Sequence, residues 1–239
     1  MDYLMADIHA DLRSFKIMLR KIRYDSTRDR VIIIGDVLDR NSQPLELLQY
    51  IKNYLNDGSM VLLKGNHELF CEQYLDGILE GKRWDLYGGT TTRKQVDDLC
   101  QIERHQLQAL LKSLPHYMLL QTPEFGEVVL THSGIDADYY VWNENGTINV
   151  VESIKKAVKA DEYRYLISMD IHNIPAAERK KLDRFVICGH VGTYRLNQDG
   201  SYRIYKTKEY MDIDSGCGHR KKGGRLACYC VDTGMVEYI

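Results

Sequence analysis

Short apolar runs alternate with amphipathic segments along the first part of the chain. Residues 1–6, 31–34 and 60–63 are short and mainly apolar, and the second run is rich in β-branched side chains, as buried strands are. Residues 12–22 and 44–55 carry apolar side chains at steps of three and four, which is the period of an amphipathic helix. The pattern predicts strand–helix units in series, and such units form a largely parallel sheet with right-handed crossovers.

The middle of the chain has a mostly helical pattern. Residues 84–112 and 150–183 predict helices, the first interrupted at a glycine pair and the second near a proline. Two further apolar runs predict strands, at residues 128–130 and 185–188. The helical and strand-forming segments therefore continue to alternate.

The last fifty residues are richer in strand patterns. Residues 197–201 have the composition of a hairpin turn. Strands are predicted at residues 202–205, 210–213, 226–231 and 236–239. Together with the first part of the chain, this predicts an α/β fold in which two mixed β-sheets pack together with helices outside.

Composition limits the class of protein. The 239 residues suit one domain, residues 1–239, and contents of 44% hydrophobic and 28% charged residues provide for a normal core and argue against disorder. The net charge of -2 argues against a nucleic-acid partner. The longest unbroken apolar run, residues 227–231, is far shorter than a membrane span, and no secretory leader is visible, so we expect a cytoplasmic protein without a membrane partner.

Polar residues directly follow five of the predicted strands. These segments are residues 7–9, 35–40, 65–68, 131–134 and 189–190. Because parallel strands end at one edge of a sheet, we expect their carboxylate, imidazole and amide groups to converge. This donor set has no thiolate and suits Mn, Fe or Zn ions. It is too large for one ion, so the sequence predicts a pair of divalent ions.

The order of these segments and the residues in them resemble the sequence motifs of a known family. They contain the blocks D-x-H, G-D-x-x-D-R, G-N-H-E, H-x-G and G-H, as in the phosphoprotein phosphatase branch of the calcineurin-like metallophosphoesterases. The blocks run from Asp7 to His190, and residues 213–216 are similar to the closing segment of that family. The resemblance implies a four-layer α-β-β-α sandwich and a phosphoesterase with two metal ions.

The resemblance also implies roles for individual residues. It assigns Asp7 and His9 to the first metal, Asp36 to a bridge between the two metals, and Asn66, His132 and His190 to the second metal. It assigns the catalytic roles to His67 as general acid, Asp39 as the group that orients it, and Arg40 as the phosphate clamp. The chemistry agrees, because arginine binds phosphate oxygens in pairs and histidine can be protonated near neutral pH. A hydroxide bridging the two ions would attack phosphorus directly.

Some features depart from the family pattern or lie outside its blocks. Ala10 and Asn41 stand where the family usually has glycine. Arg164 is our candidate for a second phosphate-binding arginine, although its local sequence matches poorly. Residues 216–224 are either a basic substrate loop or a solvated, flexible hairpin loop, and we favour the second. Four histidines have no block beside them and are expected in surface or core roles: His105, His116, His172 and His219.

The sequence leaves three functions open. The first hypothesis is a serine/threonine protein phosphatase. The second is a symmetrical hydrolase of dinucleoside tetraphosphates such as diadenosine tetraphosphate, which the same ligands would serve. The third is an inactive metal-binding module, and the joint presence of Asp39, Arg40 and His67 argues against it. The expected partner is thus a phosphoprotein or a small phosphorylated molecule, with manganese as the metal in assays and iron or zinc as alternatives.

Overall fold

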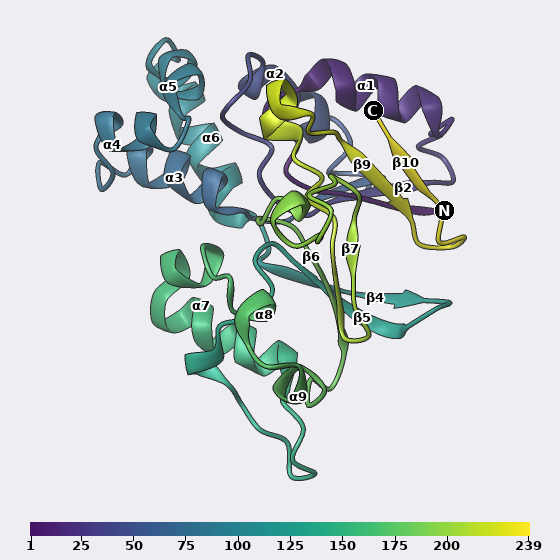
Figure 1. The fold of residues 1–239 in the computed structure, drawn as a ribbon. Helices are drawn as coiled ribbons and strands as arrows, with labels where there is room; N and C mark the ends of the chain where they lie inside the picture. Colours follow the sequence, from purple (N-terminus) through teal and green to yellow (C-terminus); the bar gives the residue numbers. More distant parts are fainter.

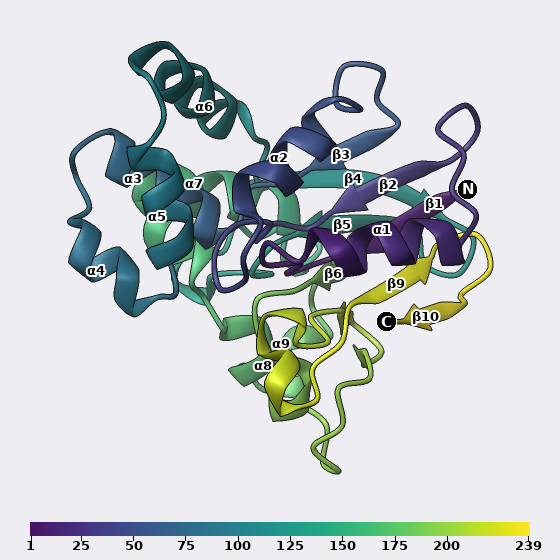
Figure 2. The same cartoon turned by 90° about the horizontal axis from the view of Figure 1, so that it is seen from above.

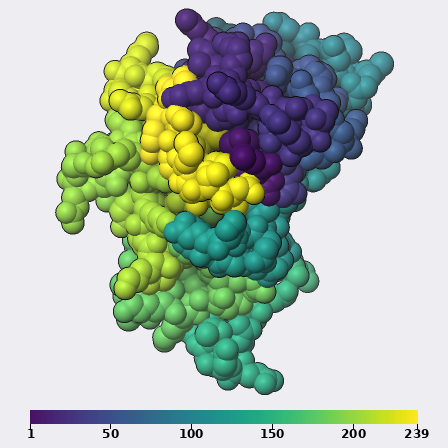
Figure 3. All heavy atoms as spheres, turned by 90° about the vertical axis from the view of Figure 1, so that its right-hand side faces the viewer, coloured from purple at the N-terminus to yellow at the C-terminus, as the bar shows by residue number.

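The structure is a computed structural model that describes residues 1–239, and its first β-sheet contains both ends of the chain. In spatial order its strands are β10 (Val236–Tyr238), β9 (Ala227–Cys230), β1 (Asp2–Met5), β2 (Arg30–Ile33) and β3 (Met60–Leu62). Strands β1, β2 and β3 are parallel, whereas β9 is antiparallel to both β1 and β10. The C-terminal residues consequently lie beside the N-terminal ones on the surface (Figure 3).

The second β-sheet also has five strands. In spatial order they are β4 (Tyr117–Thr122), β5 (Gly126–Thr131), β6 (Phe185–Cys188), β8 (Tyr210–Asp212) and β7 (Tyr205–Lys206). Strands β5, β6 and β8 are parallel, and β4 and β7 are antiparallel edge strands. The sequence pattern did not predict β4, which pairs with β5 along its whole length.

The two sheets pack face to face between layers of helices (Figures 1 and 2). A buried cluster between them joins Leu4 and Ile32 of the first sheet to Val128 and Ile187 of the second. On the outer faces, α1 (Leu12–Lys21) and α2 (Pro44–Lys52) cover the first sheet and α7 (Val150–Leu166) covers the second. The predicted architecture of two packed mixed sheets flanked by helices is confirmed.

The helices begin where the sequence supplies start signals. Asp11 caps α1 by accepting a hydrogen bond from the Ser14 backbone N–H at 2.9 Å, and Pro44 occupies the first turn of α2. The remaining α-helices are α3 (Asn66–Leu75), α4 (Gly81–Leu86), α5 (Thr90–Asp97), α6 (Gln101–Ser113), α8 (Asp170–Asn173) and α9 (Ala176–Arg179). Short 3₁₀-helices are η1 (Ala137–Tyr139), η2 (Thr193–Arg195) and η3 (Cys217–Lys222). No helix has both the length and the apolar character that a membrane span requires.

The predicted hairpin around residues 197–201 is wrong. The turn forms, but η2 precedes it and the strand after it is only the two-residue β7. The Asn197 amide donates hydrogen bonds to the carbonyl oxygens of Ser201 (2.9 Å) and Arg203 (2.8 Å), so the side chain holds the turn in place of a strand partner. The Tyr202 ring packs against Tyr194, with ring centres 5.0 Å apart.

Candidate metal centre

The predicted site residues lie just beyond the carboxyl ends of strands from both sheets. Asp7 and His9 follow β1, and Asp36, Asp39 and Arg40 follow β2. The short loop after β3 leads to Asn66 and His67 at the start of α3, whereas His132 follows β5 and His190 follows β6. Because β1 to β3 are parallel, as are β5 and β6, and the sheets pack face to face, these loops meet at one edge of the sandwich.

The backbone of these loops is unusual. Eight residues other than glycine have a positive φ, and all but Arg23 belong to the loops after β1, β2 and β6: Asp7, His9, Ala10, Asp36, Asp39, Arg40 and His190. The left-handed conformation costs such a residue about 1–2 kcal/mol, and strain of this kind concentrates at functional sites. Ala10, with a φ of 57°, adopts the conformation that suits the glycine usual at that position of the family pattern. Asn41, the other departure, donates its side-chain amide to the His9 carbonyl oxygen at 2.6 Å.

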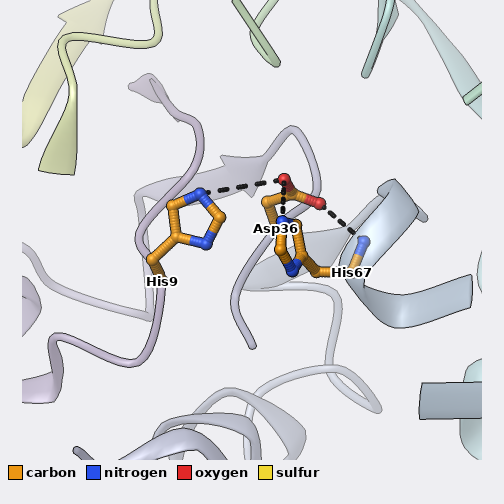
Figure 4. Close-up of side chains that lie close together, drawn as sticks. All are labelled: His9, Asp36 and His67. Carbon is orange, nitrogen blue, oxygen red and sulfur yellow. Dashed lines mark hydrogen bonds and ion pairs between the residues drawn. The ribbon is translucent and has the colours of Figure 1, made fainter. Parts of the chain in front are cut away.

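Asp36 lies at the junction of two donor clusters. One contains His9, Asp36 and His67, and the other contains Asp36, His132 and His190, with the donor atoms of each cluster within 4.8 Å of one another. Oδ2 of Asp36 lies 3.8 Å from Nε2 of both His9 and His67, and Oδ1 lies 3.5 Å from Nε2 of His132. Figure 4 shows the two imidazole rings of the first cluster directed at this carboxylate. Its two oxygens therefore face different clusters.

Hydrogen bonds define which ring nitrogens are free. Nδ1 of His9 lies 3.0 Å from the Leu38 carbonyl oxygen, and Nδ1 of His132 lies 3.1 Å from the Ile34 carbonyl oxygen. A carbonyl oxygen can only accept, so both Nδ1 atoms donate and each Nε2 presents a lone pair. The His9 lone pair faces Oδ2 of Asp36. The His132 lone pair faces Oδ1 of Asn66 at 2.9 Å as well as Oδ1 of Asp36. Only acceptors meet there, an arrangement that a cation between them would satisfy.

Burial leaves several of these polar atoms without partners. Asp7 Oδ1 and His9 Nε2 are buried, make no hydrogen bond and lie 3.9 Å apart. Burial raises the pKa of Asp7, and the charges of Asp214 and Asp36 raise it further. Burial also lowers the pKa of His190 to about 3, which keeps its imidazole neutral. Divalent ions bind neutral imidazoles and closely spaced carboxylates, so the residues present fit such ions.

His67 is held by a network that the sequence reasoning found only in part. Its Nδ1 lies 2.6 Å from Oδ2 of Asp39, and the indole N–H of Trp84 donates to the same oxygen at 2.7 Å. The Thr92 hydroxyl donates to the other oxygen of Asp39. Burial lowers the pKa of His67, but the charges of Asp36 and Asp39 outweigh burial, and the net shift is upward. Neither Trp84 nor Thr92 was among the predicted site residues.

Glu68 holds the loop that carries Asp36. Glu68 was not among the predicted site residues, and its fully buried carboxylate accepts four backbone hydrogen bonds. The donors are the N–H groups of Asp36 (2.7 Å), Val37 (2.9 Å), Leu38 (3.2 Å) and Gly65 (3.0 Å). The carboxylate thereby ties the loop after β2 to the start of α3.

We expect Glu68→Gln to lower the free energy of unfolding by about 1–3 kcal/mol, the usual cost of unsatisfied buried donors, since an amide NH₂ would face N–H groups. Urea unfolding of the metal-free protein, followed by circular dichroism, measures this loss. Glu103→Gln is the matched control, because Glu103 caps α6 in the same way at an exposed position. A loss in Glu68→Gln no larger than that in Glu103→Gln would contradict the role.

Arg40 connects the metal cluster to the segment expected as a solvated, flexible loop. Its Nη2 lies 3.2 Å from His67 Nε2, and its Nη1 lies 3.4 Å from Nε2 of His219. The expectation of a flexible loop is wrong, because residues 217–222 form η3 and Gly218 in it lies against the site. A Cβ on Gly218 would lie 2.6 Å from the His9 ring and 2.8 Å from the Arg40 side chain, so glycine permits this close approach.

Two other residues lie outside the metal cluster. Arg164 is not brought to the cluster, because Nε pairs with Asp136 at 3.0 Å and Nη2 pairs with Asp138. His172 lies in a separate group with the buried residues Cys188 and Asp212, a position that agrees with the expected surface or core role. Of the predicted site residues, Arg164 alone is therefore engaged elsewhere.

Known proteins resemble the chain in sequence and in fold. The symmetrical bis(5'-nucleosyl)-tetraphosphatase of Actinobacillus pleuropneumoniae serotype 5b (strain L20) is 28% identical over 187 residues, which cover 77% of this chain and 63% of that protein. A metallophosphoesterase from Sphaerobacter thermophilus matches the fold with a TM-score of 0.57 at 14% identity, over 99% of this chain and 86% of that one. The cold-active protein-tyrosine phosphatase of a Shewanella species matches the fold with a TM-score of 0.57 at 17% identity, over 99% of this chain and 79% of that one.

The family itself follows from a match over most of the sequence. Residues 3–215 match the family described as Calcineurin-like phosphoesterase, and this range contains all the loops of the metal cluster. The chain spans 63% of the length of the Actinobacillus relative. The two sheets and their flanking helices form the metallophosphoesterase fold of the structural neighbours. The chain belongs to the calcineurin-like phosphoesterase family.

Proposed function

We propose that this chain is a metal-dependent phosphoesterase that cleaves symmetrical dinucleoside tetraphosphates. The observation that carries the reaction type is Asp36, whose two oxygens face two separate donor clusters. In this proposal Asp7, His9 and Asp36 hold one divalent ion, and the second is held by Asp36, Asn66, His132 and His190. Bound there, the ions supply Lewis acidity toward phosphate oxygens and an activated water.

The side chains around the ions handle the phosphate and the proton. His67 gives its Nε2 proton to the leaving oxygen, while Asp39 at Nδ1 fixes the tautomer and the ring orientation. Arg40 has no carboxylate partner, so its guanidinium is free to bind equatorial phosphate oxygens. Catalysis here rests on positioning and charge stabilisation.

The choice of substrate follows the relatives. The sequence blocks alone placed a serine/threonine protein phosphatase first and tetraphosphate hydrolysis second. The 28% identity to a symmetrical tetraphosphatase supports the reverse order. Phosphoserine or phosphothreonine protein is the second candidate, because His67, Asp39 and Arg40 act on the scissile phosphate whatever the rest of the substrate is. Manganese is the proposed assay metal, with iron or zinc as alternatives that suit the same oxygen and nitrogen donors.

The test is a direct comparison of substrates. The manganese-loaded protein, with its metal content verified, is assayed for kcat/KM on diadenosine tetraphosphate and on a phosphothreonine peptide in one buffer. We expect the dinucleotide to be preferred at least about tenfold, a difference of only 1.4 kcal/mol, and to yield ADP as the sole nucleotide product. Preference for the peptide would make this a protein phosphatase. Inactivity on both, with metal bound, would support a binding module.

A further inference from the structure

A small pocket adjoins the metal cluster on the side of Arg40. Its volume is about 170 Å³. Arg40, His190 and Asp214 line it next to the cluster, and Tyr194, Arg195 and His219 line it from η2 and η3. Arg40 spans the two regions, with one guanidinium nitrogen facing His67 and another facing His219. The pocket therefore lies beside Arg40, on the far side of its guanidinium group from His67.

Backbone hydrogen bonds fix the two segments that form the pocket. The Thr193 N–H donates to the Asp214 carbonyl oxygen at 2.8 Å, and the Gly216 N–H donates to Asp214 Oδ1 at 2.8 Å. The Tyr194 ring packs edge-on against His219, with ring centres 6.3 Å apart. The pocket walls are thus held in place before any ligand binds, which lowers the entropy cost of binding.

Two arginines, Arg40 and Arg195, line this pocket together with one buried carboxylate, Asp214. Arg195 donates from Nε to the Tyr194 hydroxyl at 3.0 Å, and neither Arg195 nor Arg40 forms an ion pair with a carboxylate. Burial lowers the pKa of His219, and the nearby charges of Arg40, Lys222 and Arg195 lower it further. The side chains of Arg40 and Arg195 are exposed, so both guanidinium groups can reach an anion from solvent. Paired guanidinium groups of this kind suit phosphate oxygens.

The proposed reaction leaves negative charge beyond the scissile phosphate. Water oxygen bonds to one central phosphorus, the bridging P–O bond breaks, and its electron pair stays on the leaving oxygen, which takes the proton of His67. The water loses a proton to solvent as its oxygen bonds to phosphorus, and His67 regains its proton from solvent. One water is consumed and two nucleoside diphosphates are released. The leaving group is thus a nucleoside diphosphate with two phosphates, whereas the leaving group of a phosphoserine peptide is a serine hydroxyl with none. Cationic groups beyond Arg40 and the metal cluster would stabilise this additional negative charge.

We propose that Arg195, together with Tyr194 and His219, forms a subsite for the diphosphate of the leaving nucleoside diphosphate. This inference rests on the proposed function. Arg195 is then the residue that selects substrates with further phosphate next to the scissile one. The Tyr194 ring, which packs against Tyr202 behind it, offers an aromatic surface beside that phosphate.

The experiment has one arm on binding and one on turnover. Calorimetry measures ADP affinity of the manganese-loaded wild type, Arg195→Gln, Arg195→Lys and Arg203→Gln. Kinetics measure the ratio of kcat/KM for diadenosine tetraphosphate to that for p-nitrophenyl phosphate, which has a single phosphate. Arg203→Gln is the matched control, because Arg203 is 72% exposed, pairs with Asp199 and does not line the pocket.

We expect Arg195→Gln to weaken ADP binding and to lower the kinetic ratio, each by about 10- to 100-fold, the usual loss for a charge-assisted hydrogen bond. Arg195→Lys should recover part of the loss, and Arg203→Gln should change neither quantity. Unchanged ADP affinity in Arg195→Gln would overturn the subsite. Loss of ADP affinity in Arg195→Gln, with no tetraphosphate hydrolysis by the wild type, would instead retain the subsite and reject the proposed substrate.

Discussion

Asp36→Asn is expected to lose both metal ions and to lower kcat by more than about 10⁴-fold, beyond the range for loss of a single acid–base group. Each oxygen of Asp36 faces a different donor cluster, so one substitution weakens both metal sites. Elemental analysis of the purified protein measures the metal content, and phosphate release from p-nitrophenyl phosphate measures kcat.

The substitution retains the shape of the side chain, which separates metal loss from misfolding. Oδ1 of Asp36 accepts the His67 backbone N–H at 3.0 Å, and the asparagine oxygen can keep that bond. The control is Asp138→Asn, which removes an exposed carboxylate that pairs with Arg164 outside the cluster. After removal of metal, both variants should unfold like the metal-free wild type. Two bound ions in Asp36→Asn would show that Asp36 does not bridge them.

The convergence of the site was predictable from the sequence because it depends on topology. Apolar runs located β1, β2, β3 and β6, and polar residues directly after buried parallel strands must share an edge. His132 and His190 are far from Asp36 in sequence and follow strands of the other sheet, and this rule together with the packing of the two sheets brings the three side chains together.

The groups that support the site were less predictable, because they depend on tertiary contacts. Glu68 is a normal first-turn glutamate by its sequence, and only the approach of the loop after β2 makes it an acceptor for that loop. Trp84 lies 45 positions from Asp39 and has no recognisable spacing to it. The same holds for η3, whose glycines indicate a flexible loop until Gly218 is seen packed against His9 and Arg40.

Edge strands were also difficult to predict. Strand β4 alternates poorly between apolar and polar side chains, and only Leu120 and Thr122 in it are buried, so it gave no clear period. Its partner β5 supplies the pairing that stabilises it. The hairpin predicted around residues 197–201 failed for the opposite reason. The composition of a turn was present, but no strand directly precedes the turn to pair with the strand after it.

His67→Ala is expected to retain both metal ions and to lower kcat by about 10²–10⁴-fold on an alkyl phosphate, the usual range for loss of a general acid. The leaving alkoxide is strongly basic and needs the proton, whereas p-nitrophenolate leaves readily without one. The loss on p-nitrophenyl phosphate should therefore be much smaller. Single-buffer kinetics on the two monoesters, with metal content measured in parallel, test this dependence on the leaving group.

The pattern across substrates distinguishes proton donation from a purely structural role. If His67 only supported the site, for example through its contact with Arg40, its loss would slow both substrates equally. His105→Ala is the control, because this exposed histidine on α6 forms a ring hydrogen bond with Gln101 outside the cluster, and its loss should leave both rates unchanged. Asp39→Asn should show the same dependence on the leaving group in weaker form, since Asp39 orients the His67 ring and does not itself donate the proton. Equal losses of His67→Ala on both monoesters would remove His67 from the role of general acid.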